Sequence, residues 1–252
     1  ARAKVLLQEL KNASEVDQLE LARAAEAATD GNLARARQVL TRISQRDPQN
    51  IDALAALGEV ELLAQDAKAA TEVWTKAAQV EPSPRTEFGL ARAKLLAGDT
   101  KGAEQQAAKV LKQNPEHVGA RMLLARAAWT EHNEDKALEL LSFLDKPDNP
   151  ASPSEVVDGE TLRGDIHLSR SRITHAEKAY QKALTISPKA AGALAGLGDA
   201  LYRSGRFSEA LARFKAGVEA DPDNVVASIG IAKTQIALER LEDAKAILKK
   251  LA

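Results

Sequence analysis

Five of the nine prolines recur at a nearly constant spacing along the chain. Successive prolines of this set are 34, 33, 73 and 34 residues apart, at Pro48, Pro82, Pro115, Pro188 and Pro222. Each follows a run rich in alanine and leucine whose apolar residues have helical spacing. Proline lacks the amide hydrogen and disfavours helix in the residue before it, so it ends one helix before the next begins. A period near 34 residues predicts a protein built from repeats of one supersecondary unit.

One repeat is clearest in residues 191–224. Its first half (193–202) has apolar residues at helical spacing and small residues where another helix must approach closely. A turn follows at Gly205, and glycine tolerates the left-handed backbone that often ends a helix. A second helical pattern (208–217) precedes the closing proline. Each repeat is therefore predicted to contain two helices joined by a tight turn.

The composition agrees with a helical chain that has a core of small side chains. Alanine supplies 49 of the 252 residues, whereas aromatic residues make up only 3%. Alanine is the best helix former, and strands favour the β-branched and aromatic residues that are scarce here. Much of the alanine recurs at one second-helix position, at Ala36, Ala70, Ala103, Ala137, Ala176, Ala210 and Ala244.

This pattern resembles the tetratricopeptide repeat family. In residues 191–224 the resemblance rests on Leu194, Leu197, Gly198, Leu201, Ala210, Phe214, Gly217 and Pro222, and in residues 51–84 on Leu54, Leu57, Gly58, Ala70, Trp74, Ala77 and Pro82. Weaker copies bring the number to about seven, after a second helix of a preceding repeat in residues 1–14, and the alanine-rich style suggests a bacterial source. The resemblance implies an all-α, right-handed superhelical solenoid of antiparallel helix pairs, whose first helices line a concave groove. Arg23 and Arg163 stand where the family prefers leucine, so we expect local looseness there.

The period fails once. Residues 145–156 contain three prolines within seven residues, which cannot all lie inside a helix. We expect an N-terminal array over 1–144, a linker or long loop over 145–156, and a C-terminal array over 157–252. Two alternatives stay open here: a lengthened loop across which the stack continues, and a hinge that changes the direction of the superhelix.

No pattern of chemical groups indicates catalysis. The chain has no cysteine, and its four histidines form no metal-binding pair, so we expect no catalytic, cofactor or metal site and no enzyme. His117 and His132 fall in or near turns, where solvated side chains are expected. The 35 basic and 36 acidic residues give no reason to expect nucleic acid, and no segment suits a membrane span. There is no signal peptide, so we expect a cytoplasmic protein, or a periplasmic one if a signal was removed.

Partner binding is therefore expected in the groove. The side chains that face it include Arg85, Phe88, Arg92, Met122, Arg126 and Trp129 before the break, and Asp165, Asp199 and Tyr202 after it. Arginine, tryptophan and methionine are enriched at interfaces, so the groove is predicted to be basic and aromatic first, then acidic. The alternatives are that Phe88 and Trp129 pack on a neighbouring helix or are covered by the linker, and that Arg92 and Arg126 pair with nearby carboxylates. By contrast, Trp74, Tyr180 and Phe214 share one second-helix position and are predicted to be core.

Two functions fit this sequence. The first is a non-enzymatic interaction scaffold that binds a protein or peptide in the groove and helps to assemble or localise a complex. The second is a structural spacer of a longer protein of a bacterial secretion, envelope or motility machine, which self-associates through open solenoid ends. One groove position holds Ala25, Glu59, Arg92, Arg126, Asp165, Asp199 and Lys233. Because none of these is asparagine, a carboxylate clamp of the kind known in the family is not expected.

Overall fold

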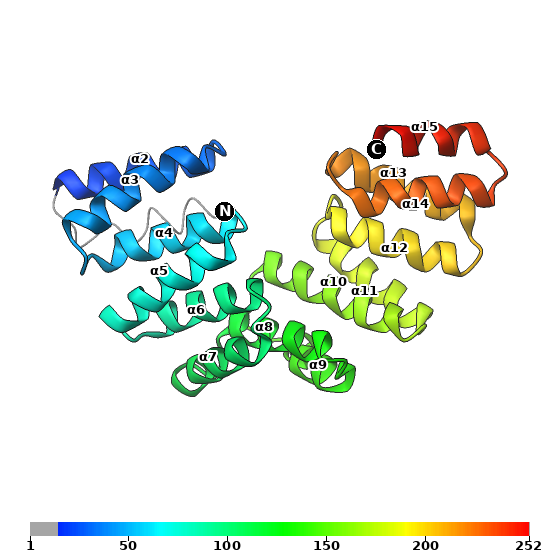
Figure 1. Ribbon diagram of the computed structural model, residues 1–252. Helices are drawn as coiled ribbons and strands as arrows, with labels where there is room; N and C mark the ends of the chain where they lie inside the picture. The colour runs from blue at the N-terminus through cyan, green and yellow to red at the C-terminus, as the bar shows by residue number, and fades with distance from the viewer. Residues whose placement is uncertain (1–14, 252) are drawn as a thin grey trace. The chain divides into compact units, whose positions relative to one another are not determined.

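The computed structural model describes residues 15–251, and this part of the chain is entirely helical (Figure 1). It contains fourteen α-helices, one short 3-10 helix and no strand in the described residues. The chain divides into two compact units, and the boundary lies between Thr130 and Glu131. The second helix predicted in residues 1–14 lies outside the described residues.

Unit 1 is a stack of consecutive helices. Its helices are α2 (Glu15–Thr29), α3 (Leu33–Arg46), α4 (Ile51–Leu63), α5 (Ala67–Val80), α6 (Pro84–Leu96), α7 (Thr100–Gln113) and α8 (Val118–Thr130). Each helix packs on the one before it, and the first helices of neighbouring pairs (α2, α4, α6 and α8) also contact one another in order (Figure 1).

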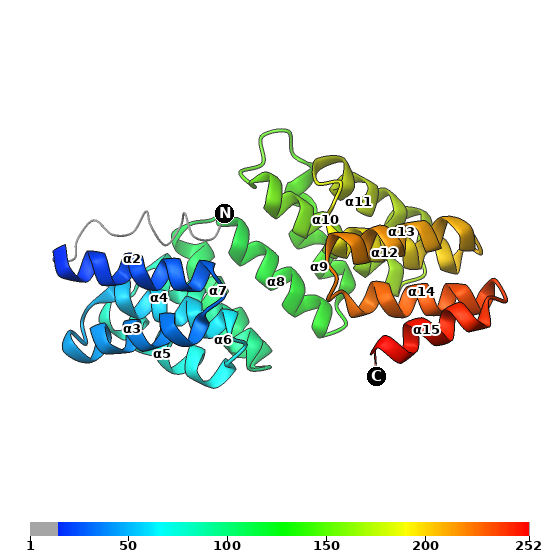
Figure 2. The ribbon, with the colours of Figure 1, turned by 90° about the horizontal axis from the view of Figure 1, so that it is seen from above.

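Unit 2 repeats this arrangement. Its helices are α9 (Glu134–Leu141), the 3-10 helix η1 (Ser142–Asp145), α10 (Pro153–Ser169), α11 (Ile173–Ile186), α12 (Ala191–Arg203), α13 (Phe207–Ala220), α14 (Val225–Ala237) and α15 (Leu241–Leu251). The first helices α10, α12 and α14 contact one another in order, and α15 is the outermost layer of the unit in both views (Figures 1 and 2). The predicted all-α solenoid of helix pairs is confirmed.

The turn inside each helix pair needs one residue with left-handed backbone. These residues recur at the repeat spacing, at Gly31, Gln65, Gly98, His132, Ser171, Gly205 and Glu239, all with φ between 55° and 78°. The prediction for Gly205 is confirmed, since its φ is 74°. Glycine occupies three of these seven turns; the other four hold non-glycine residues, for which this backbone is less favourable.

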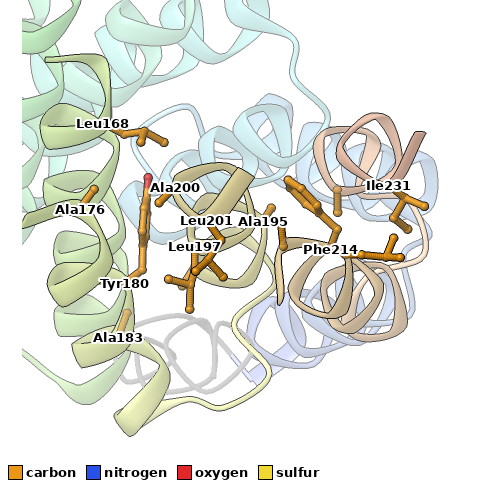
Figure 3. Packing of buried hydrophobic residues seen from close by; sticks show 14 residues of the cluster. Leu168, Ala176, Tyr180, Ala183, Ala195, Leu197, Ala200, Leu201, Phe214 and Ile231 are labelled. Carbon is orange, nitrogen blue, oxygen red and sulfur yellow. The ribbon is translucent and has the colours of Figure 1, made fainter. Parts of the chain in front are cut away.

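The core is organised around three aromatic side chains from second helices. Trp74, Tyr180 and Phe214 are all buried, as predicted. Each ring lies in a slot between a glycine of its own first helix and a glycine of the next first helix. The glycines are Gly58 and Gly89 for Trp74, Gly164 and Gly196 for Tyr180, and Gly198 and Gly230 for Phe214. A methyl group at any of the six would overlap the ring, so glycine is required by close approach. Figure 3 shows the rings of Tyr180 and Phe214 among the buried side chains of unit 2.

In repeats that lack the aromatic residue, the side chain on the next first helix is larger than glycine and fills the space of the ring. In unit 1 the ring position is Leu40 in α3, and the next first helix carries Ala56 in place of the slot glycine. In α7 the ring position shrinks to Ala107, and the next first helix fills the space with Leu123. Because interiors are closely packed, a smaller residue on one helix is matched by a larger one on its neighbour.

The proline-rich break is shorter than predicted. The segment outside helices covers residues 146–152, because η1 ends at Asp145 and α10 begins at Pro153. The expectation that residues 153–156 are not helical is therefore wrong. Proline is tolerated in the first turn of a helix, and Ser152 closes a capping box with Glu155. That the segment is a hinge stays a prediction.

The expectation of loose helix packing at Arg163 is also wrong. Its guanidinium donates to the Asp145 carboxylate at 2.8 Å, to Glu160 at 3.1 Å and to the carbonyl oxygen of Leu141 at 2.7 Å. Glu160 is buried, and Lys182 Nζ lies 2.6 Å from its carboxylate. This network, with only 14% of the Arg163 side chain exposed, fastens η1 to α10 and α11. A charged residue at a leucine position thus stabilises the packing here through paired hydrogen bonds.

Candidate functional site

The predicted groove arginines of α6 are bound to carboxylates of α4. Arg85 Nη1 lies 3.1 Å from the Asp52 carboxylate, and Arg92 Nη1 lies 2.5 Å from the Glu59 carboxylate. The two pairs join equivalent positions of neighbouring first helices, about two turns apart on the same helix face. Much of the positive charge that the sequence suggested on α6 is therefore neutralised by α4.

Phe88 lies between α6 and the start of α8. Its ring centre is 4.7 Å from that of His117, 5.9 Å from the Arg92 guanidinium carbon, and directly over Gly119. His117 is not the solvated residue that the sequence suggested, because its Nδ1 accepts the amide hydrogen of Ala120 and caps α8. Phe88 remains half-buried, so it packs between the helices and still presents part of its ring.

The three predicted residues of α8 differ in exposure. Met122 is buried, Trp129 is half-buried, and Arg126 is exposed. Since these residues are four and three apart in sequence, they lie along one face of the helix. Unlike Arg85 and Arg92, Arg126 forms no ion pair within the described part of the chain. Arg126 therefore offers its full charge one turn from the partly exposed ring of Trp129.

The acidic residues predicted in unit 2 are engaged within their own helix pairs. Asp165 accepts a 2.7 Å hydrogen bond from the Tyr180 hydroxyl, and burial together with this carboxylate raises the pKa of Tyr180 far above its usual value. Asp199 lies 2.9 Å from the guanidinium of Arg203, which also donates to the carbonyl oxygen of Leu168. Arg203 therefore offsets the charge of Asp199, whereas the Tyr180 hydroxyl positions Asp165 without neutralising it.

Tyr202 stands apart from these carboxylates. Its ring is half-buried and lies 5.3 Å from that of Phe207 in a tilted arrangement. Because Phe207 begins the following helix, this contact joins α12 and α13 across their turn. Tyr202 therefore packs within its own helix pair and presents only part of its ring to a partner.

Two features of the charged groups escaped the sequence reasoning. The buried glutamates Glu61 and Glu160 are each bound by cations. Arg37 of α3 binds Glu61, whereas Arg163 of the same helix and Lys182 of α11 bind Glu160. His167 and His175 face each other with ring centres 5.2 Å apart. Burial, and next the neighbouring His175, lower the pKa of His167. Only the apolar pattern around Glu61 and Glu160 could have signalled their burial.

Nothing in residues 15–251 assembles a metal site. No group of three histidine, aspartate or glutamate side chains in that range could hold an ion. Unit 2 does contain an open hollow of about 460 Å³ where the starts of α10 and α12 meet the end of α11. Val157, Ile186 and Ala191 line it together with the polar residues Ser154, Asp158, Thr161 and Ser187. None of the helices described is long and apolar enough to cross a bilayer.

The stacked helix pairs, the left-handed turn residues and the aromatic slots together define a helical-repeat solenoid protein. The sequence profile described as "Tetratricopeptide repeat" matches residues 94–152, 167–224 and 201–252. Because these matches cover more than half of the chain, it belongs to the tetratricopeptide repeat family.

Individual relatives are distant. The human protein O-mannosyl-transferase TMTC1 is 26% identical over 182 residues, which are 70% of this chain and 20% of that protein. The chain spans about a fifth of the length of the first curated relatives it matches. A solved tetratricopeptide repeat protein from Parabacteroides merdae superposes with a TM-score of 0.69 at 16% identity, covering 92% of this chain and 91% of that one. Cut9 in the solved Cut9–Hcn1 assembly of the APC/C reaches 0.74 at 13% identity, covering 92% and 45%. These solved structures share the fold.

Proposed function

We propose that this protein is a non-enzymatic interaction scaffold that binds a partner protein segment along the first helices of unit 1. The observation that carries the proposal is Arg126, which is exposed, forms no ion pair within the described residues and lies one turn from the half-buried Trp129, with the half-buried Phe88 on the neighbouring helix α6. Proteins of this family generally act as interaction scaffolds, and both assemblies and single chains share the fold. We further propose that it has about seven repeats and comes from a bacterium.

The binding mechanism follows from the residues of α6 and α8. Apolar side chains of the partner would cover Phe88 and Trp129, and an acidic group would bind Arg126. Interface energy concentrates in a few aromatic and arginine residues surrounded by weaker contacts. Arg92 contributes less than Arg126, because Glu59 already binds its guanidinium at 2.5 Å. The partner segment is therefore expected to combine aromatic or aliphatic residues with one acidic side chain.

Affinity capture from native lysate followed by mass spectrometry tests this site. The bait is the wild-type chain or the triple variant Arg92→Ala/Arg126→Ala/Trp129→Ala, and the variant is expected to lose the captured partner. A matched control, Lys68→Ala/Lys76→Ala/Gln79→Ala, removes three exposed side chains of α5 and should capture as the wild type does. Circular dichroism confirms that each bait is folded. Equal capture by the triple variant and the wild type would exclude these residues as the binding site.

A second candidate function is a structural spacer of a longer protein that self-associates through its ends. It is favoured by apolar side chains left exposed on α14 and α15, since exposed apolar patches often mark interfaces. Light scattering over a range of concentrations tests it. A mass that stays that of one chain at all concentrations would contradict self-association.

A further inference from the structure

The open hollow of unit 2 has no part in the function proposed above. It has a volume of about 460 Å³, and its lining residues belong to α10, α11, α12 and the turn between the last two. Val157, Ile186 and Ala193 give it apolar walls. Ile186 is 41% exposed there, although its side chain is wholly apolar. A concavity of this size with apolar walls is a candidate binding site.

The corresponding place in unit 1 is occupied by two rings of the chain itself. Phe88 of α6 covers Gly119 of α8, because a methyl group added to that glycine would lie 2.6 Å from Cζ of the ring. The ring of His117 packs on the ring of Phe88, with 4.7 Å between their centres. Both rings are half-buried between the starts of α6 and α8.

Both rings are missing from the same place in unit 2. At the equivalent repeat positions, Thr161 replaces Phe88 and Ala190 replaces His117. Thr161 faces the equivalent glycine, since a methyl group added to Gly192 would lie 3.6 Å from its Cγ2 atom. Thr161 and Ala190 both line the hollow. The hollow therefore corresponds to space that two aromatic side chains occupy in unit 1.

Asp158 gives the hollow an acidic side. It lines the hollow, it is exposed, and it forms no ion pair within the described part of the chain. The equivalent Asp52 of α4 lies 3.1 Å from the guanidinium of Arg85, which belongs to the next first helix. The residue of α12 at the position of Arg85 is Gly192, which has no side chain to pair with Asp158. The cation that would complete this pair is therefore expected from another molecule.

These two features define the chemistry of the occupant. Apolar walls of ring size favour an aromatic side chain, and the carboxylate beside them favours a cation. Aromatic and arginine side chains are also the residues that dominate the energy of protein interfaces. Because sites for small molecules enclose most of the ligand, an open hollow suits a side chain that projects from another protein.

We propose that this hollow binds an aromatic side chain of a partner protein segment, and that Asp158 binds an arginine or lysine next to it. The aromatic ring takes the place that Phe88 and His117 fill in unit 1. The inference does not rest on the binding site proposed in unit 1, because it uses other residues on other helices.

Two tetrapeptides serve as probes. One is acetyl-glycyl-arginyl-phenylalanyl-glycinamide, and in the other the arginine follows the phenylalanine. Each is titrated into the nitrogen-15-labelled full chain, and the amide resonances of Gly192 and Ala193 are followed by NMR. For at least one peptide we expect saturable shifts with a dissociation constant of about 1 mM, the order expected for one buried ring and one ion pair. Alanine in place of the peptide's phenylalanine should weaken binding about tenfold or more.

Filling the hollow tests where the ring binds. Thr161→Phe copies the arrangement of Phe88 over Gly119 and should weaken binding about tenfold or more, because the ring occupies the space. Its melting temperature should equal or exceed that of the wild type, which distinguishes a filled hollow from an unfolded chain. The matched control is Thr71→Phe in α5. Thr71 and Thr161 are both half-buried, and each hydroxyl donates to the carbonyl oxygen four residues earlier. This control should bind the peptide as the wild type does.

A charge exchange tests the role of Asp158. Asp158→Lys should weaken binding of the arginine peptide about two- to fivefold, as expected for a partly exposed ion pair. The same variant should bind the peptide with glutamate in place of arginine more tightly than the wild type does. Glu219→Lys, which changes an exposed carboxylate of α13, is the matched control and should alter neither affinity.

Three results would overturn the proposal. One is the absence of saturable shifts with either peptide, and another is equal binding by Thr161→Phe and the wild type. The third is a wild-type chain that forms dimers which Thr161→Phe dissociates, since a second copy would then occupy the hollow. Arg126→Ala/Trp129→Ala should bind the peptides normally, so failure here and failure of the unit 1 site are distinguishable.

Discussion

Charged residues of the first helices bind a neighbouring first helix in unit 1 but a residue of their own helix pair in unit 2. In unit 1, Glu59 and Asp52 of α4 bind Arg92 and Arg85 of the next first helix. In unit 2, Asp165 binds the hydroxyl of Tyr180 in its own helix pair, and Asp199 binds Arg203 one turn along its own helix. The same repeat position therefore joins neighbouring repeats in one unit and stabilises a single repeat in the other. The charge that a partner meets depends on this pairing.

The helix starts differ as well. In unit 1, Asn50 and Ser83 cap α4 and α6 with their side chains. In unit 2, the residue before α12 is Ala190, whose methyl side chain cannot accept the free amide hydrogens. Unit 2 instead contains two aromatic slots, around Tyr180 and Phe214, against one in unit 1. Unit 2 thus has more aromatic slots, while its helices α11, α12 and α13 start without the side-chain caps that α3 to α7 of unit 1 have.

The largest expected effect comes from emptying a slot in each unit. Trp74→Ala in unit 1 and Phe214→Ala in unit 2 should each lower the free energy of unfolding by about 3–5 kcal/mol, because a large cavity replaces the ring. Urea denaturation followed by circular dichroism measures the loss. Adding Gly230→Leu to Phe214→Ala should recover part of it, since this copies the natural pair of Ala107 and Leu123. If the double variant is no more stable than Phe214→Ala, the size compensation between helices is wrong.

The next largest loss of stability is expected for Arg163 of unit 2, which pairs with the buried Glu160, in comparison with Arg92 of unit 1, which pairs with the partly exposed Glu59. Arg163→Ala should destabilise unit 2 by about 3 kcal/mol, because it leaves the buried Glu160 carboxylate without one of its two cations. Arg92→Ala should cost less than about 1 kcal/mol, because its pair with Glu59 is partly exposed. Thermal unfolding of both variants measures the difference. Equal losses would show that the burial of Glu160 does not govern the cost.

A smaller effect is expected from giving α12 the cap that α4 has. The backbone of Ala190 has φ −67° and ψ 98°, close to the φ −69° and ψ 95° of Asn50. Ala190→Asn should therefore accept the amide hydrogen of Ala193 without strain and stabilise unit 2 by about 1 kcal/mol. Asn50→Ala is the reverse control and should destabilise unit 1 by a similar amount. A melting temperature for Ala190→Asn at or below that of the wild type would contradict this expectation.

The smallest expected effect is a pH dependence in unit 2. Burial and the nearby His175 lower the pKa of His167 in the folded chain, so the unfolded chain binds more protons below pH about 6.5. Stability should be complete above that pH and fall as the pH drops through the folded-state pKa. Asp99, Asp135 and Glu209 have lowered pKa values, so their contributions are lost only below pH about 4. Melting curves at pH 7 and pH 5 should differ for the wild type and much less for His167→Gln; an equal difference in both would exclude His167 as the cause.

Part of the candidate site followed from the repeat alone. The phase of the repeat correctly separated Trp74, Tyr180 and Phe214, which are buried, from Phe88, Trp129 and Tyr202, which are half-buried. It could not show that Glu59 neutralises Arg92 whereas Arg126 forms no ion pair in the described part of the chain. The residues that decide this lie a full repeat away in sequence, and ion pairs depend on side-chain geometry that spacing does not determine. The error at Arg163 has the same origin, since Asp145 and Leu141 reach it from η1 and α9.

The sequence by itself determined the helices, their turns and the class of fold, because these depend on local preferences and on a pattern repeated every 34 residues or so. Helix-breaking prolines, small residues at fixed positions and one glycine-compatible turn per pair suffice for that. Only the tertiary structure decided which charged side chains are paired with one another and which half-buried side chains pack between helices. Both properties arise from contacts between helices, and repeats of similar sequence acquire different surroundings according to what stacks next to them.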